Sequence, residues 1–468
     1  MNLYIPIKKE LPTRSISFYC KKADIKEKVM ELLIPVDMYA GDEYHADYYA
    51  PLPLENVTPD TLVIEGEAPE AFFKAIQSEK PQADSLSDKK EENRPSIHFT
   101  AKTGWINDPN GLVYQDGTYH LYFQYNPFDI AWNNMCWGHA VSQDLLHWQQ
   151  LKTVLYPDEN GTIFSGSGIR NDRGLLGLPK NALLFFYTSA GDTFTQHMAY
   201  SLDGGKTLVK FPGSCLENKN CKEDRDPKVF WHETSNAYIM VLWLEETDFG
   251  IYRSTDLTSW EQTDRVTLQD ACECPDLVEV RFDDGSTRWA FFCADGFYFW
   301  GDFDGYHFVT DHKKHCLYFN KNLYAAQTYS GIDGQTIFVP WLRLKNTGSD
   351  YTGAMGIPRT MTGVHTAQGD MICCKPVIAD EKRREELVSD KDNVTYMEFT
   401  RPEDRTEQTS IIIEETEITY NWDNGELAVG QQIYLTTDSA DKLSLIKDGN
   451  ILEIFINDGV LSGAFLTL

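Results

Sequence analysis

The segment Ser142-Gln143-Asp144-Leu145, followed by Trp148, is the first of four related turns that decide the fold. The later three are Ser201-Leu202-Asp203-Gly204, Ser254-Thr255-Asp256-Leu257 followed by Trp260, and Asp302-Phe303-Asp304-Gly305. Their aspartates, at positions 144, 203, 256 and 304, are 59, 53 and 48 residues apart. Repeats of about fifty residues that each hold several short strands are typical of β-propeller blades. Ser and Asp also bond nearby backbone amides in ordinary turns, but the near-constant spacing favours the propeller.

Short β-rich runs fill the spaces between these turns. Examples are His120–Phe123, Ala182–Tyr187 and Tyr238–Trp243, and no long amphipathic helix interrupts them. The pattern extends over residues 95–371. A period of about fifty residues divides this region into five blades.

The flanking segments differ in composition. Residues 1–80 mix short alternating runs with one helical stretch and are predicted to form a small accessory module. Residues 81–94 are polar and charged, as in a solvated linker. Residues 380–468 hold alternating segments with hairpin turns, which predict a small β-sandwich. The predicted fold class is therefore all-β: a five-bladed β-propeller at 95–371 followed by a small β-sandwich, with a small N-terminal accessory module.

The charge of the chain excludes some classes of partner. Its 468 residues include 42 Lys and Arg against 71 Asp and Glu, a formal net charge of -29. Such a charge repels phosphate backbones and anionic lipids, so neither nucleic acid nor a membrane is expected as a partner. Aromatic residues make up 13% of the chain. This content suits a sugar-binding cleft, although large β-sheet cores also use many aromatics.

The N-terminus and the cysteines bear on the compartment. Residues Met1–Lys9 lack the basic start and apolar run of a secretory signal. The ten cysteines are scattered without the density of a disulfide scaffold, so they are expected to be mostly reduced. We therefore expect a cytoplasmic protein.

Three tight turns each present a carboxylate. Asp108 lies between Asn and Pro, Asp226 lies between Arg and Pro, and Glu273 lies between two cysteines. A nearby guanidinium favours the ionised form of Asp226, whereas weakly polar neighbours suit Glu273 to proton donation near neutrality. Each turn alone is also ordinary turn or ion-pair chemistry.

The cysteines around Glu273 raise the competing interpretation of a metal site. No second cysteine pair or histidine cluster has zinc spacing, so no metal and no cofactor are expected. Glycoside hydrolysis, by contrast, needs one carboxylate that attacks or stabilises the anomeric carbon and one carboxylic acid that protonates the leaving oxygen. The three carboxylates come from different repeats and meet only if the repeats circle a common axis, as propeller blades do.

At these positions the sequence resembles glycoside hydrolase family 32, the invertase, levanase and inulinase group, over most of residues 94–360. Trp105–Gly111 resembles the family's nucleophile motif, Arg225-Asp226-Pro227 its transition-state-stabilising motif, and Glu273-Cys274-Pro275 its acid/base motif. Further matching segments are Tyr122–Pro127, Trp137–Ala140, Phe164–Ser167, Tyr324–Gln327 and Gly353–Met355 with Pro358-Arg359.

The resemblance implies roles for particular residues. Asp108 is expected as nucleophile, Asp226 as transition-state stabiliser and Glu273 as acid/base. The substrate-binding residues that it implies are Asn107, Gln124, Trp132, Phe164, Ser165 and Arg225. Gln124 and Trp132 also have plausible structural roles, at a strand edge and in the core. The segment Tyr318–Asn322 lacks the Asp/Gly-containing turn usual in the family, which leaves the sugar contacts of that repeat open.

The implied activity is that of a retaining β-fructosidase, a glycoside hydrolase that releases terminal fructosyl units through a covalent fructosyl-enzyme. Sucrose and short fructooligosaccharides or fructans are the expected substrates. Two alternatives stay open: a fructosyltransferase on the same scaffold, and a catalytically inactive fructan-binding protein. The resemblance assigns nothing to residues 1–93.

Overall fold

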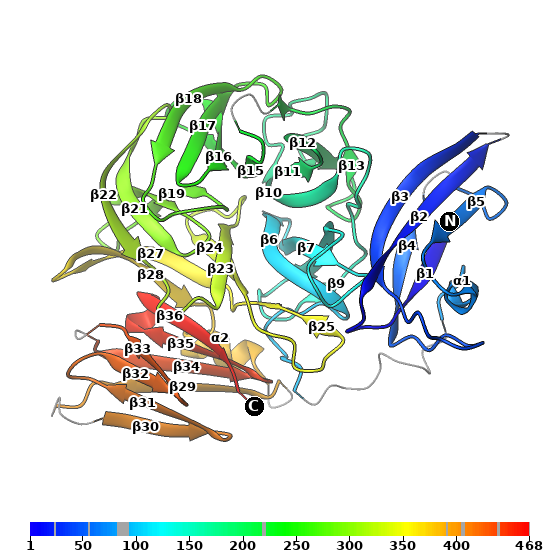
Figure 1. Ribbon diagram of the computed structural model, residues 1–468. Coiled ribbons are helices and arrows are strands. Elements are labelled where there is room, and N and C mark those ends of the chain that lie inside the picture. The colour runs from blue at the N-terminus through cyan, green and yellow to red at the C-terminus, as the bar shows by residue number, and fades with distance from the viewer. Residues whose placement is uncertain are drawn as a thin grey trace.

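The computed structural model describes residues 1–22, 25–54, 57–81, 93–217, 221–389, 392–403, 408–437 and 440–467. Its strands fall into three groups along the chain (Figure 1). Residues 82–92, most of the predicted linker 81–94, lie outside the described residues. No helix in the described part is long and apolar enough to cross a membrane.

The N-terminal group consists of two small sheets and one short helix. β1 (Asn2–Ile7) pairs with β4 (Tyr48–Pro53), and β2 (Thr13–Lys22) lies between β3 (Ile25–Pro35) and β5 (Leu62–Gly66). The helix α1 (Glu70–Ala75) falls in the stretch with the predicted helical pattern. Apolar side chains that alternate along the strands form one core with the helix, among them Ile5, Ile16, Phe18, Ile34 and Phe72.

Five sheets follow, one for each predicted blade. The first has the order β25 (Tyr351–Thr352), β6 (Gly104–Gln115), β7 (Thr118–Asn126), β8 (Cys136–Ser142) and β9 (Gln149–Gln150). The second has the order β10 (Thr162–Arg170), β11 (Leu183–Ala190), β12 (Phe194–Ser201) and β13 (Val209–Lys210), with β14 (Leu216–Glu217) also on β12. The third has the order β15 (Arg225–His232), β16 (Ala237–Glu245), β17 (Asp248–Ser254) and β18 (Glu261–Thr267).

The last two blades close the ring. The fourth has the order β19 (Asp276–Arg281), β20 (Thr287–Phe292), β21 (Phe297–Phe303) and β22 (Phe308–Cys316). The fifth has the order β23 (Leu323–Thr328), β24 (Thr336–Leu342), β27 (Arg359–Thr366) and β28 (Gly369–Pro376), with β26 (Ala354–Met355) also on β24. The Ser330 backbone joins the fifth blade to the first, because its N–H donates to Leu112 O at 3.0 Å and its O accepts from Tyr114 N at 2.9 Å.

The four repeated turns occupy the same place in their blades, between the third and fourth strands. In the first blade Leu145 N donates to Ser142 Oγ at 2.9 Å, and Asp144 Oδ1 accepts from the next backbone amides. In the third blade Leu257 N donates to Ser254 Oγ at 2.8 Å in the same way. The repeated Ser and Asp residues therefore mark the same turn in successive blades. Their side chains accept hydrogen bonds from backbone donors where each sheet reverses.

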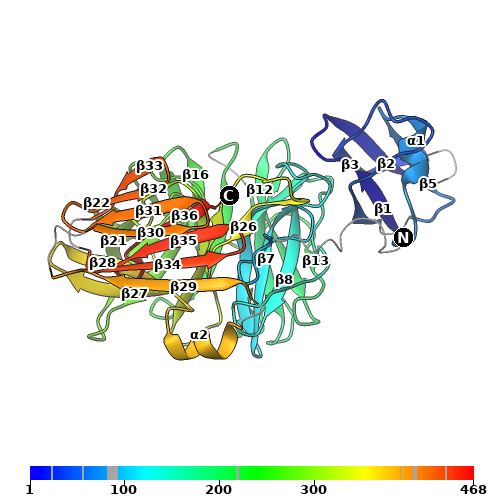
Figure 2. The same cartoon turned by 90° about the horizontal axis from the view of Figure 1, so that it is seen from below.

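Two four-stranded sheets pack face to face after the helix α2 (Glu381–Leu387) (Figures 1 and 2). One has the order β29 (Val394–Thr400), β34 (Lys442–Asp448), β35 (Ile451–Ile456) and β36 (Leu461–Leu466), with a short 3-10 turn at Asn457–Gly459. The other has the order β30 (Gln408–Ile413), β31 (Thr416–Asn421), β32 (Glu426–Val429) and β33 (Gln432–Leu435). Tyr420, Trp422 and Phe465 are prominent in the core between them.

The predicted fold class is confirmed: the chain is all-β, with five blades followed by a β-sandwich. The predicted end of the propeller at 371 falls inside β28, which pairs with β27 as far as Pro376. The sequence alone did not show this because the last strand, Gly369–Pro376, has a short apolar core and no distinctive turn after it.

Candidate active site

The innermost strand of each blade, or the turn just before it, contributes to one site at the centre of the propeller. These strands are β6, β10, β15, β19 and β23, each the first full-length strand of its sheet. Asp108 lies on β6, Asp226 on β15, and Glu273 just before β19. The structure therefore brings the three predicted carboxylates together from three blades.

Asp108 lies in an irregular part of β6. The pairing of β6 with β7 shifts register between Ile106 and Pro109, so Asn107 and Asp108 together face the single residue Gln124. The Asp108 carboxylate accepts hydrogen bonds from Ser165 Oγ at 2.6 Å and from Asn107 Nδ2 at 3.1 Å. Burial raises the pKa of Asp108, although these two hydrogen bonds oppose the shift.

Asp226 is held in a strained conformation. Its φ is 67°, in the left-handed region that non-glycine residues rarely adopt, and its side chain is buried. The backbone N–H donates to Thr188 Oγ1 at 3.1 Å, and Oδ2 accepts from Cys274 N at 3.0 Å. Burial, with the negative charge of Glu273, raises the pKa of Asp226 to about 7.

Glu273 has a different partner for each carboxyl oxygen. Arg225 Nη2 donates to Oε1 at 2.6 Å, and the Tyr324 hydroxyl donates to Oε2 at 2.5 Å. The Arg225 guanidinium in turn lies 4.0 Å from the centroid of the Trp243 ring. These contacts from the third and fifth blades fix the Glu273 carboxyl over the site.

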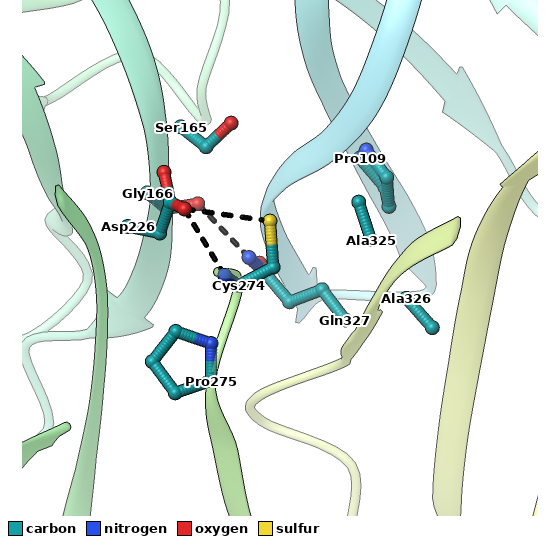
Figure 3. A pocket seen from close by; sticks show the side chains of 9 residues that line it. All are labelled: Pro109, Ser165, Gly166, Asp226, Cys274, Pro275, Ala325, Ala326 and Gln327. Atoms are coloured by element: carbon teal, nitrogen blue, oxygen red, sulfur yellow. Dashed lines mark hydrogen bonds between the residues drawn. The ribbon is translucent and has the colours of Figure 1, made fainter. Parts of the chain in front are cut away.

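Cys274 joins the three carboxylates into one cluster. Its Sγ lies 3.6 Å from Asp108 Oδ2 and 3.5 Å from Asp226 Oδ2, and the neighbouring residue is Glu273. Figure 3 shows Cys274 directed toward Asp226 across a small pocket. The residues that line this pocket are Pro109, Ser165, Gly166, Asp226, Cys274, Pro275, Ala325, Ala326 and Gln327.

Backbone strain is concentrated around this pocket. Positive φ angles occur at Asp226 (67°), Glu273 (53°), Cys274 (40°) and Ala325 (48°). Non-glycine residues in this conformation cost about 1 to 3 kcal/mol each and persist where the surrounding structure holds them. Strain in three blades at the same point is typical of a functional site rather than of a scaffold.

The other predicted substrate-binding residues surround the carboxylates. Gln124 is buried opposite the Asp108 bulge, and its Nε2 has no partner among the described residues. Trp132 is 53% exposed, so it is not a core residue, and its ring packs edge-on against Phe164 at a centroid distance of 6.1 Å. Phe164 directly precedes Ser165, which lines the pocket and binds Asp108, so the two rings lie beside a strand segment that carries a pocket residue.

A buried ion pair lies beneath the pocket. Lys228 Nζ is 3.0 Å from Asp276 Oδ2 and donates to Thr328 Oγ1 at 2.8 Å. Asp276 Oδ2 also accepts from Thr328 N at 2.9 Å. The pair therefore ties together β15, which carries Asp226, β23, which carries Tyr324, and β19, which follows Glu273.

Two residues of the site have no role that the sequence alone predicts. Tyr324 binds Glu273, and Trp243 supports Arg225. The signal for Tyr324 was its place in a segment that resembles the family. No such signal exists for Trp243, which lies beside Arg225 only because β15 pairs with β16. The divergent segment Tyr318–Asn322 faces the sandwich, since Phe319 N donates to Ser462 O and Asn322 Nδ2 donates to Ala464 O.

Among the described residues, no metal-binding arrangement accompanies the carboxylates. Within the described ranges, no three or more His, Cys, Asp or Glu side chains are placed to hold a metal ion. The geometry instead presents a nucleophile-like carboxylate with hydroxyl and amide donors, and a second carboxyl held by a guanidinium and a phenol. Such a pair suits general acid/base and nucleophilic chemistry at an acetal carbon.

Known proteins with related sequences share this region. The family model for the glycosyl hydrolases family 32 N-terminal domain matches residues 98–376. A levanase from Bacillus subtilis is 35% identical over 61% of this chain and 47% of its own length. An extracellular exo-inulinase from Meyerozyma guilliermondii is 31% identical over 80% of each chain. The match thus spans about half the length of the levanase and four-fifths of the exo-inulinase.

A solved structure shares the fold as well. A fructofuranosidase variant from Schwanniomyces occidentalis, complexed with fructosylnystose, superposes with a TM-score of 0.70 and 25% sequence identity. The superposition covers 82% of this chain and 93% of that chain.

Proposed function

Because the chain belongs to glycosyl hydrolase family 32, we propose that it is a retaining β-fructosidase that hydrolyses terminal β-D-fructosyl bonds of sucrose and short fructooligosaccharides or fructans. The proposal rests on one observation: the carboxyl groups of Asp108, Asp226 and Glu273 lie together around Cys274. The names of the relatives, a levanase and an exo-inulinase, support a fructoside as substrate. The fructosylnystose complex of the related structure supports the same class.

In the proposed mechanism Asp108 attacks the anomeric carbon of a terminal fructosyl unit while Glu273 protonates the departing oxygen. The bond from carbon to the leaving oxygen breaks as the bond to the Asp108 carboxylate forms, which gives a covalent fructosyl-enzyme. Glu273, now ionised, removes a proton from water. That water displaces Asp108 and releases fructose with net retention.

The surrounding donors serve distinct steps of this mechanism. Ser165 and Asn107 orient the Asp108 carboxylate for attack. Arg225 and Tyr324 hold Glu273 in reach of the leaving oxygen and can stabilise its ionised form after proton transfer. Asp226, which Cys274 N holds in place, is positioned to accept hydrogen bonds from fructose hydroxyls and to stabilise the oxocarbenium-like transition state.

Fructose and glucose release from sucrose and from inulin-type and levan-type oligomers tests the proposal. Wild type should release fructose, and release should collapse in Asp108→Asn and in Glu273→Gln. Asp116→Asn, an exposed turn aspartate at the other end of β6, is the control and should behave as wild type. Tight fructan binding without release by wild type would support the inactive binding protein, and transfer products at high sucrose would support the transferase.

We also propose a cytoplasmic location. Cys215 and Cys272, for example, are partly buried and form no disulfide. Thiols that stay outside disulfides suit a reducing compartment. Fractionation of the producing cells, with fructosidase activity assayed in the soluble and external fractions, tests this location.

A further inference from the structure

A propeller loop reaches into the N-terminal group of strands. The loop lies between β7 and β8 and includes Phe128, which is fully buried within the core of β1–β5 and α1. Ile130 packs against the same core. The N-terminal group lies beside the first two blades, next to β9 and β13 in Figure 1 and next to β13 in Figure 2. The loop therefore completes a core that belongs to another part of the chain.

The far end of the loop is held by Asn134. Its Oδ1 accepts from Leu33 N at 2.9 Å, and its Nδ2 donates to Leu33 O at 2.8 Å. Leu33 lies on β3, the edge strand of the N-terminal three-stranded sheet. The side-chain amide thus takes the place of a neighbouring strand, which satisfies an edge that would otherwise need water or a partner. Asn134 has a φ of 44°, a conformation that Asn tolerates better than most residues.

The loop is also braced from within. Asn126, which is fully buried, donates from Nδ2 to Ala131 O at 2.8 Å and accepts at Oδ1 from Phe128 N at 3.1 Å. At the last residue of the loop, Met135 O accepts from Ile163 N at 2.9 Å. This last contact connects the loop to the strand that carries Phe164 and Ser165.

Trp132 lies between these anchors. Phe128 and Asn134 fix the two ends of the loop, and Trp132 projects from it with half of its surface exposed, beside Phe164, the residue before the pocket residue Ser165. An exposed indole at a sugar pocket offers a flat apolar face to a pyranose or furanose ring. Its position depends on contacts made outside the propeller.

We propose that the N-terminal group of strands is a specificity element that holds Trp132 in place to contact the sugar of the fructoside. Asn134 and Phe128 are the loop residues that contact the N-terminal group and position the loop, and Trp132 is the loop residue that contacts the sugar. The proposal rests on the fructosidase activity proposed above. A second contact supports the docking: Lys9 Nζ binds Asp350 Oδ1 at 2.8 Å, and Asp350 O accepts from Gly104 N on β6 at 2.8 Å.

The test replaces Asn134 by Gly, which removes the side chain and keeps a residue that tolerates the positive φ. Asn134→Gly should raise KM for an inulin-type trisaccharide about tenfold and leave kcat within about twofold, because the loop binds substrate without touching the carboxylates. Asn236→Gly is the matched control: Asn236 has a φ of 50° in the exposed turn between β15 and β16, and its replacement should leave KM unchanged.

A double-variant cycle tests whether Asn134 acts on substrate binding through Trp132. In a Trp132→Ala background, Asn134→Gly should raise KM no further, since both changes remove the same contact. A full additional rise in that background would overturn the proposal, and so would an unchanged KM in the single variant.

Hydrogen exchange separates failure of this inference from failure of the proposed function. Asn134→Gly should speed amide exchange in residues 127–135 and leave the peptides of the third and fourth blades unchanged. If wild type hydrolyses no fructoside, the proposed function fails. In that case faster exchange in this loop would still support its dependence on the N-terminal strands, and unchanged exchange would overturn it.

Discussion

Tyr324 and Arg225 bind opposite oxygens of the Glu273 carboxyl from different blades. Each is a positioning residue, because the leaving oxygen would meet the carboxyl itself. Charge-assisted hydrogen bonds of this kind are stronger than neutral ones and fix direction as well as charge.

Replacement of Tyr324 by Phe tests the phenol contact. The variant keeps the ring, which lies 4.0 Å from the Arg343 guanidinium, and loses only the hydroxyl donor. A hydrogen bond to a charged group contributes about 1.5 to 3 kcal/mol, so kcat/KM for sucrose should fall about 10- to 150-fold. Tyr434→Phe, on the sandwich strand β33, serves as the control. Equal rates for Tyr324→Phe and wild type would show that the contact has no role in the reaction.

Asp226 predicts a dependence of stability on pH. Burial and the Glu273 charge raise its folded-state pKa to about 7 from an ordinary value of 3.8. The folded protein therefore binds more protons than the unfolded chain between these values, and the stability from this group is lost as pH rises through 7. Asp226→Asn cannot ionise, so its Tm should exceed that of wild type at pH 8, with a smaller difference at pH 4.

Calorimetry at pH 4, 6 and 8 checks this expectation. Asp302→Asn, an exposed aspartate on β21, should show no such trend. A Tm difference that does not change with pH would rule out Asp226 as the source. Because the same residue is proposed to stabilise the transition state, the variant should gain stability and lose activity.

At the scale of strands, the Lys228–Asp276 ion pair joins three inner strands beneath the pocket. Both side chains are buried, so removal of one charge leaves the other without compensation. Lys228→Met should lower the free energy of unfolding by about 3 to 5 kcal/mol. Urea unfolding followed by fluorescence measures this, and the double variant Lys228→Met/Asp276→Asn should recover part of the loss. No recovery would mean that the Lys side chain stabilises by packing alone.

The sequence predicted these elements to different degrees. The Ser-x-Asp turns could be predicted from the sequence because their side chains bond the next few backbone amides, so the pattern is local. The end of β28 could not be predicted from the sequence, because it is defined by pairing with β27. The three carboxylates were found by motif, but the Tyr324 contact with Glu273 joins residues 51 positions apart and depends on how blades four and five meet.

At the scale of the whole molecule, a buried network connects the propeller to the sandwich. His98, just before β6, binds Asp448 at 2.8 Å and Glu453 at 3.1 Å. Arg359 of the fifth blade also pairs with Glu453. Burial would lower the pKa of His98, but its bonds to the two carboxylates outweigh this effect and raise the pKa to about 9.

This network predicts a loss of stability in mild alkali. The folded protein holds a proton on His98 that the unfolded chain releases above pH 6.5, so the stability from His98 is full below pH 6.5 and lost as pH rises through 9. His98→Gln should be less stable at pH 6, with a flatter decline of Tm from pH 6.5 to 9.5. Thermal unfolding across this range measures it, with His45→Gln, at an exposed histidine of the N-terminal group, as control. Parallel slopes for wild type and His98→Gln would contradict the assignment.

The central claim is that Asp108 forms a covalent bond with fructose while Glu273 serves as acid and base. Trapping of the intermediate tests it most directly. The Glu273→Ala variant is incubated with β-fructofuranosyl fluoride. The fluoride of this substrate needs little protonation to leave, and the variant lacks the base that activates water. Mass spectrometry of the digested protein should then find one hexosyl residue on the peptide that contains Asp108. A label on another carboxylate, or inverted fructose released without any label, would contradict the account.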